Sequence, residues 1–463
     1  MADPDSSREF DLAIIGTGSG NSLVTADFDD KRVAIIESGT FGGTCLNVGC
    51  IPTKMYVYAA EVANTVRHAA RYGVDAHIDG VRWRDIRDRI FGRIDPISAG
   101  GLDYRTNGTN TTTFLGHAEF IGPDALRVDL GGGASSELRA EQIVIATGGR
   151  PMVPAPILDS GVPFHTSDSI MRIDELPERL LIYGGGYIAA EFAHVFSALG
   201  SQVTMICRST TLLRHLDAEL ADRFTALVAG RWDLRLGTTV VTAGSSASGT
   251  SLQLSDGTTV AGDALLVATG REPNTDRLGL AAAGVQRMTD GRVRVDCYGR
   301  TNVAGIWSLG DVSSDYQLKH VANHEARVVA HNLAHPADLC EFDHRFVPSA
   351  VFTDPQIASV GCTEEELRAR DLPYRAVVQD YGDTAYGWAM EDHTGICKLI
   401  ADPATGRLLG AHLMGYQASN LIQPLIQAMS LDQRVTDLAR GQYWIHPALM
   451  EVVENALLKL GLD

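Results

Sequence analysis

Residues 42–54 read Gly-Gly-Thr-Cys-Leu-Asn-Val-Gly-Cys-Ile-Pro-Thr-Lys and hold two cysteines, Cys45 and Cys50, with four residues between them. Two thiols this close in the chain can form and open a disulfide without a large rearrangement. Only a thiolate is a useful nucleophile, so one thiol of the pair needs a lowered pKa. The helix that we expect to start near Ile51 and Pro52 would supply positive potential there. The stretch therefore predicts a redox-active dithiol.

The composition is that of an ordinary globular protein of 463 residues, with a net charge of −18. This length corresponds to about two to four domains, and the negative charge argues against nucleic acid or an anionic membrane surface as a partner. No stretch is apolar over the roughly 18 residues that a membrane span requires. Met1 to Phe10 shows no secretory signal. We therefore expect a cytoplasmic protein, and we expect no metal site.

The cysteines outside the pair are scattered, and we expect them to be reduced and inert. They are Cys207, Cys297, Cys340, Cys362 and Cys397. Because stable disulfides are rare in a reducing compartment, the pair Cys45 and Cys50 is expected to be catalytic or redox-sensing and not structural.

A dinucleotide-binding pattern opens the chain. The apolar run 10–15 predicts a strand, a glycine-rich turn follows it, and a second strand over 32–37 ends in Glu37. The turn brings Gly16, Gly18, Ser19 and Gly20 close to a pyrophosphate, and Glu37 would accept hydrogen bonds from a ribose. The crossover over residues 20–31 is short, so we expect an abbreviated helix. Asn21 stands where the third glycine of this pattern usually stands.

The same pattern occurs a second time. A strand over 180–183 leads into the turn of Gly184 and Gly186, then into a helical run over 190–196 and a strand over 202–206. No acid follows this strand. Arg208 and Arg214 follow it instead, and they suit a 2′-phosphate, although solvated surface arginines are the alternative interpretation. The first unit therefore predicts FAD and the second predicts NADPH.

Three further strands end in turns that could serve these sites. The strands over 143–145 and 265–267 each run into Ala-Thr-Gly, which places Thr147 and Gly148 in one turn and Gly270, followed by Arg271, in the other. The strand near residue 306 ends in Gly310 and Asp311. The Asp311 carboxylate suits a flavin ribityl hydroxyl, with a simple Asx turn as the alternative.

After residue 346 the nucleotide signals stop. Short alternating strands mix with predicted helices over 363–370, 420–429 and 450–460, which indicates an α+β domain. The predicted fold class is α/β, with two Rossmann-like, three-layer dinucleotide-binding domains followed by this α+β domain. The predicted boundaries are 1–160 for the FAD domain with the dithiol, 161–278 for the NADPH domain, 279–345 for a return to the central region, and 346–463 for the last domain.

These parts together predict an electron relay from NADPH through the flavin to the dithiol and then to an external disulfide. Lys54 could stabilise a reduced flavin, and Glu191 is its candidate partner. A departing thiol also needs a proton source. His446, fixed before Pro447 and followed five residues later by Glu451, is the candidate. A His-Pro turn alone is more often structural, but the dithiol upstream favours the catalytic interpretation, and the Pro447 peptide bond is a candidate for the cis form.

From residue 11 to about 460 the chain resembles the pyridine nucleotide-disulfide oxidoreductases, which include glutathione reductase, dihydrolipoamide dehydrogenase and mercuric reductase. The resemblance is carried most specifically by residues 42–54. It implies that Cys45 is the interchange thiol that attacks substrate and that Cys50 is the charge-transfer thiol beside the flavin. It also implies that His446 is the acid/base, oriented by Glu451, and that it serves the partner subunit's dithiol in a homodimer built on the C-terminal domain.

The resemblance extends the set of expected cofactor contacts. For FAD it adds Thr44, Lys54, His117, Ala118, Leu318, Lys319 and His320. For NADPH it adds Tyr187, Ile188 and Glu191. Lys319 and His320 depart from the Thr-Pro step of glutathione reductases, and Ala448 replaces a frequent Thr after His-Pro.

Residues 318–327, 379–390 and 441–446 resemble more narrowly the actinobacterial members that act on the disulfide of a cysteinyl-glucosaminyl-inositol thiol. Since this substrate is largely uncharged, no arginine clamps are expected around it. Two alternatives stay open. Dihydrolipoamide dehydrogenase would prefer NAD to NADP. A non-catalytic flavoprotein redox sensor would need no proton shuttle, so the His446 and Glu451 pair argues against it.

Overall fold

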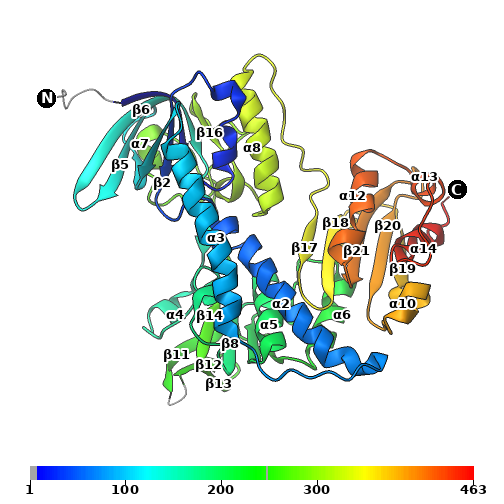
Figure 1. Cartoon of the computed structure of the whole chain (residues 1–463). Coiled ribbons are helices and arrows are strands. Elements are labelled where there is room, and N and C mark those ends of the chain that lie inside the picture. Colours follow the sequence, from blue (N-terminus) through cyan, green and yellow to red (C-terminus); the bar gives the residue numbers. More distant parts are fainter. Residues whose placement is uncertain (1–7, 247–248, 463) are drawn as a thin grey trace.

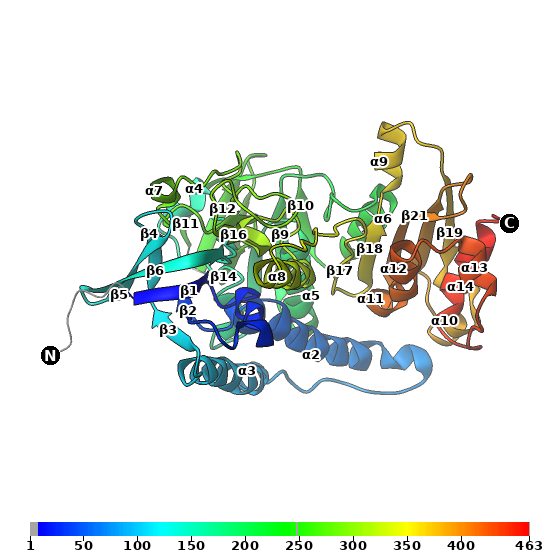
Figure 2. The same cartoon turned by 90° about the horizontal axis from the view of Figure 1, so that it is seen from above.

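The computed structural model describes residues 8–246 and 249–462 (Figure 1). Residues 1–7, where the sequence predicts no secretory signal, lie outside the described residues, as do 247, 248 and 463. Two nucleotide-binding-type units lie together, and the C-terminal domain forms the opposite end of the molecule in both views (Figure 2). The predicted α/β class with a separate C-terminal domain is confirmed.

The first unit is built on a seven-stranded sheet of order β3-β2-β1-β6-β5-β4, with β16 paired to β6. Its central strands β1, β2, β3, β6 and β16 are parallel, and β4 and β5 are joined antiparallel at one edge. The strands span Arg8–Ile15 (β1), Val33–Glu37 (β2), Thr111–Leu115 (β3), His117–Phe120 (β4), Ala125–Gly131 (β5), Ala134–Ile145 (β6) and Ile306–Ser308 (β16). Because β16 comes from far along the chain, the chain returns to this sheet after the second unit.

The crossover between β1 and β2 is abbreviated, as predicted. It holds only two short 3-10 helices, η1 (Gly20–Leu23) and η2 (Ala26–Phe28). The two longest helices, α2 and α3, follow β2: α3 contacts β3 at the edge of the sheet, and α2 extends toward the C-terminal domain (Figure 2). The helical segments span Gly43–Asn47 (α1), Cys50–His68 (α2), Ala69–Tyr72 (η3), Trp83–Thr106 (α3), Gly310–Val312 (η5) and Lys319–Ala334 (α8).

The second unit has a four-stranded parallel sheet of order β10-β9-β8-β14, covered by α5 and a three-stranded meander, with α6 following β9. A two-stranded ribbon of β7 and β15 joins it to the first unit. The strands span Gly149–Pro151 (β7), Arg179–Tyr183 (β8), Gln202–Cys207 (β9), Asp233–Leu236 (β10), Val240–Ser246 (β11), Gly249–Leu254 (β12), Thr259–Gly262 (β13), Ala264–Val267 (β14) and Arg271–Pro273 (β15). The helices span Ala155–Leu158 (α4), Ile170–Arg172 (η4), Tyr187–Leu199 (α5) and Ala218–Val228 (α6), and the next helix, Leu280–Ala283 (α7), already packs against β4 of the first unit.

The C-terminal domain has a five-stranded antiparallel sheet of order β17-β18-β21-β20-β19. Its strands span Ser349–Val351 (β17), Gln356–Gly361 (β18), Arg375–Asp380 (β19), Ile396–Ala401 (β20) and Leu408–Gly415 (β21). Its helices span Glu364–Ala369 (α9), Tyr381–Asp383 (η6), Ala385–Ala389 (α10), Ala418–Leu421 (α11), Gln423–Ser430 (α12), Val435–Arg440 (α13) and Glu451–Lys459 (α14). Strands β20 and β21 are buried almost throughout, because helices cover the sheet.

One predicted helix is wrong in its bounds. The sequence predicts a single helix over 420–429, but the structure has α11 and α12, separated at Ile422. Pro424 stands in the first turn of α12, where a missing backbone N–H costs least and the fixed φ suits a helix start. Within the described residues, no helix is long and apolar enough to span a membrane.

Candidate active site

The two cysteines of the dithiol come from consecutive helices. Cys45 lies in α1, and Cys50 is the first residue of α2. Between them, a Cβ at Gly49 would lie 2.8 Å from the carbonyl oxygen of Thr44 and 3.1 Å from the Cα of Cys45, so only glycine permits this approach. Asn47 fixes the same turn by donating to the carbonyls of Phe41 and Gly43. The sequence between the cysteines therefore brings the two thiols together.

Both cysteines are free thiols, and they share a hydrogen bond. The hydrogen bond from Cys50 and, to a smaller extent, the charge of Lys319 lower the pKa of Cys45 to about 7, against the opposing effect of burial. The same hydrogen bond raises the pKa of Cys50, together with burial and the charge on Cys45. Cys45 is therefore the first of the two to lose its proton, which suits attack on a disulfide.

The reactivity of Cys45 should report this lowered pKa. In holoenzyme reduced with excess dithiothreitol, we expect the rate of Cys45 alkylation by iodoacetamide to reach half its maximum near pH 7, not near the ordinary thiol value of 9.0. The thiolate stabilises the fold above pH 9, and this stabilisation is lost as the pH falls through about 7. Peptide mapping after short exposures at each pH measures the rate.

The Lys319→Met variant should move this midpoint upward, because it removes the positive charge that favours the thiolate. Lys459→Met is the matched control, since Lys459 donates to the carbonyl of Val378 in the C-terminal domain. A midpoint that stays near pH 9 in the unaltered protein would contradict the assignment.

A cavity of about 1150 Å³ opens beside the dithiol, with walls from both nucleotide units and from the C-terminal domain. Gly16 lies in its wall with φ of 105°, and a Cβ there would lie 2.3 Å from the carbonyl oxygen of Ala146. Asp311 also lines the cavity, with its carboxylate 3.9 Å from the Arg271 guanidinium, and burial raises the pKa of Asp311. A glycine cradle at the end of parallel strands and a buried acid fit the pyrophosphate and the polyol chain of FAD.

Nearly all of the residues that the sequence predicts for FAD line this cavity. They are Gly16, Gly18, Ser19, Glu37, Thr44, Lys54, His117, Ala118, Thr147, Gly148, Arg271, Gly310, Asp311, Leu318, Lys319 and His320. Gly20 does not line it, because it packs against Ile14 and Ala146 below the turn. Glu37 accepts hydrogen bonds from the backbone N–H and hydroxyl of Thr17 and from the N–H of Gly39.

Lys54 and Glu191 lie together where the three parts of the chain meet. The Lys54 ammonium, on α2, donates to both carboxylate oxygens of Glu191, on α5, at 2.7 Å. It also lies 4.2 Å from the ring centroid of Phe352, whose N–H donates to Glu191 at 3.0 Å. The pair predicted from the sequence is thus formed, and it lines the cavity beside Cys50.

The residues that the sequence predicts for NADPH fall into two groups. Tyr187, Ile188 and Glu191 reach the large cavity from α5. Gly184, Gly186 and Gly270 lie outside its lining, with Gly186 at the start of α5. Arg208 and Arg214 follow β9 and are exposed, and within the part of the chain that the structure describes neither guanidinium has a hydrogen-bond or ion-pair partner.

His446 and Glu451 form a pair in the C-terminal domain. The Nδ1 atom of His446 lies 3.1 Å from the Glu451 carboxylate, at the start of α14, and the His446–Pro447 peptide bond is cis. The His446 ring is largely exposed, and it does not line the cavity that Cys45 lines. Figure 1 places α14 at the outer end of the C-terminal domain, away from the start of α2. One chain alone therefore does not bring the histidine to the dithiol.

The structure shows contacts that sequence reasoning missed. Lys319 donates to the hydroxyl of Ser19 at 2.9 Å and also favours the Cys45 thiolate. Asn21 accepts two hydrogen bonds from Arg105, both at 2.8 Å, so it ties η1 to α3. Phe352 contacts Lys54 from the C-terminal domain. The only sequence signal for these contacts was that Lys319 and Asn21 differ from the residues usual at their motif positions.

The fold and the dithiol define an oxidoreductase, and the comparison with family models agrees. Residues 10–326 match the pyridine nucleotide-disulphide oxidoreductase model, and residues 347–457 match the dimerisation domain of the same family. The chain belongs to the pyridine nucleotide-disulphide oxidoreductase family, and the predicted resemblance is confirmed. Family membership implies FAD and NAD(P)H as cofactors.

Among curated relatives, the chain is 58% identical to mycothione reductase of Mycobacterium tuberculosis, over 97% of this chain and 99% of that protein. It is 34% identical to glutathione reductase of Burkholderia cepacia, over 96% and 97%, and 34% identical to dihydrolipoyl dehydrogenase of Halobacterium salinarum, over 98% and 97%. Among solved structures, the HOCl-induced flavoprotein disulfide reductase RclA from Escherichia coli superposes with a TM-score of 0.84 at 29% identity, over 96% of this chain and 99% of that one.

Proposed function

We propose that the protein is a cytoplasmic, NADPH-dependent flavoprotein that reduces mycothione, the disulfide of mycothiol, to two molecules of mycothiol. The observation that carries the reaction type is the Cys45 and Cys50 pair, with its lowered Cys45 pKa, in the wall of a cavity that fits FAD. The observation that favours mycothione over other disulfides is the 58% identity to a mycothione reductase over nearly the full length of both proteins.

In the proposed reaction, the Cys45 thiolate attacks one sulfur of the substrate disulfide. The substrate S–S bond breaks, one mycothiol leaves and takes a proton, and Cys45 keeps the other half as a mixed disulfide. Cys50 then attacks the Cys45 sulfur, releases the second mycothiol and closes the Cys45–Cys50 disulfide. When bound, FAD and NADPH supply the two electrons that return this disulfide to the dithiol.

His446 is the proposed proton donor to the leaving mycothiol, and Glu451 holds its ring. We propose that this pair acts on the partner's dithiol in a homodimer. The family match to a dimerisation domain supports the dimer. So do the side chains beside His446, because Tyr443 is 103% exposed and Ile445 is 77% exposed in the single chain. Such an apolar surface is normally covered.

The proposed cofactor is NADPH and not NADH, because Arg208 and Arg214 follow β9 and have no ion-pair partner within the described residues. An acid at this position would repel a 2′-phosphate, whereas arginines attract it. Lys54, paired with Glu191 beside Cys50, is the proposed cation next to the flavin. We propose as FAD contacts the other predicted residues that line the cavity, and as NADPH contacts the α5 residues Tyr187 and Ile188.

A substrate panel tests the proposal. With purified holoenzyme, we expect a kcat/KM for mycothione at least tenfold above that for glutathione disulfide or lipoamide. We also expect NADPH to be preferred to NADH by a similar factor, because two arginines beside a phosphate raise its affinity by about tenfold or more. Loss of nicotinamide absorbance is the measurement. Faster turnover of lipoamide with NADH would identify a dihydrolipoamide dehydrogenase instead.

A further inference from the structure

The loop that carries Arg208 and Arg214 has an unusual internal conformation. Leu213, buried inside it, adopts a left-handed φ of 53°. A non-glycine residue keeps such a conformation only where its surroundings impose it. One constraint is local, since the Leu213 N–H donates to the carbonyl of Gly185 in the glycine-rich turn at 2.8 Å. The other end of the loop, at Asp217, needs a second constraint.

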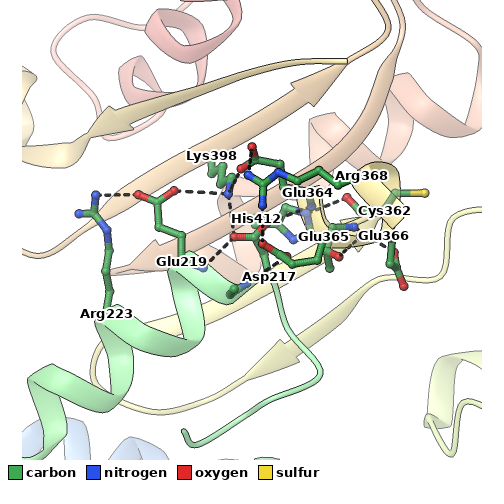
Figure 3. A network of polar contacts seen from close by, with 12 residues as sticks. Asp217, Glu219, Arg223, Cys362, Glu364, Glu365, Glu366, Arg368, Lys398 and His412 are labelled. Carbon is green, nitrogen blue, oxygen red and sulfur yellow. Dashed lines mark hydrogen bonds and ion pairs between the residues drawn. The ribbon is translucent and has the colours of Figure 1, made fainter. Parts of the chain in front are cut away.

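That second constraint comes from the C-terminal domain. Asp217 begins α6 and is fully buried. One of its carboxylate oxygens accepts from the N–H of Glu219 at 3.2 Å and from the ammonium of Lys398 at 2.9 Å. The other accepts from the N–H of Glu364 at 3.2 Å. Lys398 lies on β20 and Glu364 on α9, so two elements of the C-terminal domain hold the end of the arginine loop (Figure 3).

Lys398 is the centre of this contact. Its side chain is 2% exposed, and its ammonium lies 2.7 Å from Glu364 and 3.3 Å from Glu219, in addition to Asp217. A buried ammonium with three carboxylates has a fixed place, because losing a partner would leave buried charge uncompensated. Ala218, the first residue of α6, donates its N–H to Glu365 of the same domain at 3.3 Å.

We propose that Lys398 and Asp217 are positioning residues for 2′-phosphate recognition, through which the C-terminal domain fixes the loop of Arg208 and Arg214. Neither side chain touches the nucleotide. This inference rests on the proposed use of NADPH. If this role is right, the preference for NADPH depends on a contact between two domains. The contact joins Asp217, three residues after Arg214, to Lys398, which is 181 positions further along the chain.

The test uses Lys398→Met in the holoenzyme, which removes the ammonium and keeps most of the side-chain volume. The probes are 2′,5′-ADP, which carries the 2′-phosphate, and 5′-AMP, which does not. Displacement of the arginines by about an ångström should weaken 2′,5′-ADP binding about tenfold or more, while 5′-AMP binding stays within about twofold. In turnover, KM for NADPH should rise by the same factor, whereas kcat at saturating NADPH should stay within about twofold.

Three further variants make the result specific. Lys398→Arg keeps the charge and should restore most of the discrimination. Arg179→Met breaks the Arg179–Asp263 ion pair, which lies in the second nucleotide unit away from the arginine loop, and should leave the ratio of the two affinities unchanged. Glu365→Ala removes the partner of the Ala218 N–H and an exposed ion pair with Arg368, and it leaves Lys398 in place. It should therefore fold even if Lys398→Met does not, and it should lower 2′,5′-ADP affinity in the same direction by a smaller factor.

The outcomes separate the two proposals. Unaltered protein that binds both probes equally would overturn the proposed NADPH use and the positioning role with it. A different set of results would overturn only the positioning role. In that case the unaltered protein prefers 2′,5′-ADP, and Lys398→Met and Glu365→Ala either keep the full preference or lose affinity for both probes equally.

Discussion

Holoenzyme carrying Cys50→Ser is expected to stop after half a turnover, with one mycothiol bound to Cys45 as a stable mixed disulfide. Cys45, with its pKa lowered to about 7, is the thiol that attacks, and without Cys50 nothing releases the second half of the substrate. Holoenzyme carrying Cys45→Ser should form no adduct and show no turnover. Intact-protein mass spectrometry after mixing the reduced variants with mycothione measures the adduct, and peptide mapping locates it.

The order of the two cysteines follows from their coupled pKa values. While Cys45 is a thiolate, its hydrogen bond and charge raise the pKa of Cys50. Once Cys45 is joined to substrate, both effects vanish, and the charge of Lys54, which lowers the pKa of Cys50, meets less opposition. Cys50 is therefore activated by the step that precedes its own attack.

The matched control is Cys297→Ser, because Cys297 is also exposed but lies outside the cavity lining. This variant should turn over like the unaltered protein. An adduct on Cys50 in a Cys45→Ser background, or residual turnover of Cys45→Ser, would reverse the assigned roles.

The sequence predicted the parts of the site that local motifs encode. A strand, a glycine turn and a second strand ending in Glu37 predict a nucleotide unit, because short continuous apolar runs and glycine turns act over short distances. The spacing of His446 and Glu451 is local too, so the pair was predictable, and it is formed at 3.1 Å. The Lys54 and Glu191 contact joins two motif helices, and the order of the motifs was enough to suggest it.

The contacts that the sequence did not predict join segments without motifs. Lys398 and Asp217 are separated by 181 positions, and neither stands in a recognisable pattern. The effect of Lys319 on Cys45 depends on where the start of α8 lies relative to α1, two helices of the first unit that come from distant parts of the chain. The break between α11 and α12 was visible in principle at Pro424, but helical periodicity continued across it.

The other large effect concerns His446. The His446→Gln variant should lower mycothione turnover roughly 10²- to 10⁴-fold, the usual range for loss of an acid/base group, while NADPH still reduces the flavin at nearly the unaltered rate. Stopped-flow absorbance separates the two steps. His393→Gln, which changes another exposed histidine of the same domain, should leave both steps unchanged. Equal loss of both steps in His446→Gln would mean that the histidine has only a structural role.

Mixed dimers then decide which dithiol the histidine serves. In a dimer of one Cys45→Ser subunit and one His446→Gln subunit, a shared site pairs the intact Cys45 of one chain with the intact His446 of the other, so one of the two sites works. Coexpression of the two inactive variants should therefore restore about a quarter of the unaltered activity, since half of randomly assembled dimers are mixed. If each chain used its own histidine, every site would carry one lesion and no activity would return. The exposure of His446 and its absence from the cavity that Cys45 lines favour the first result.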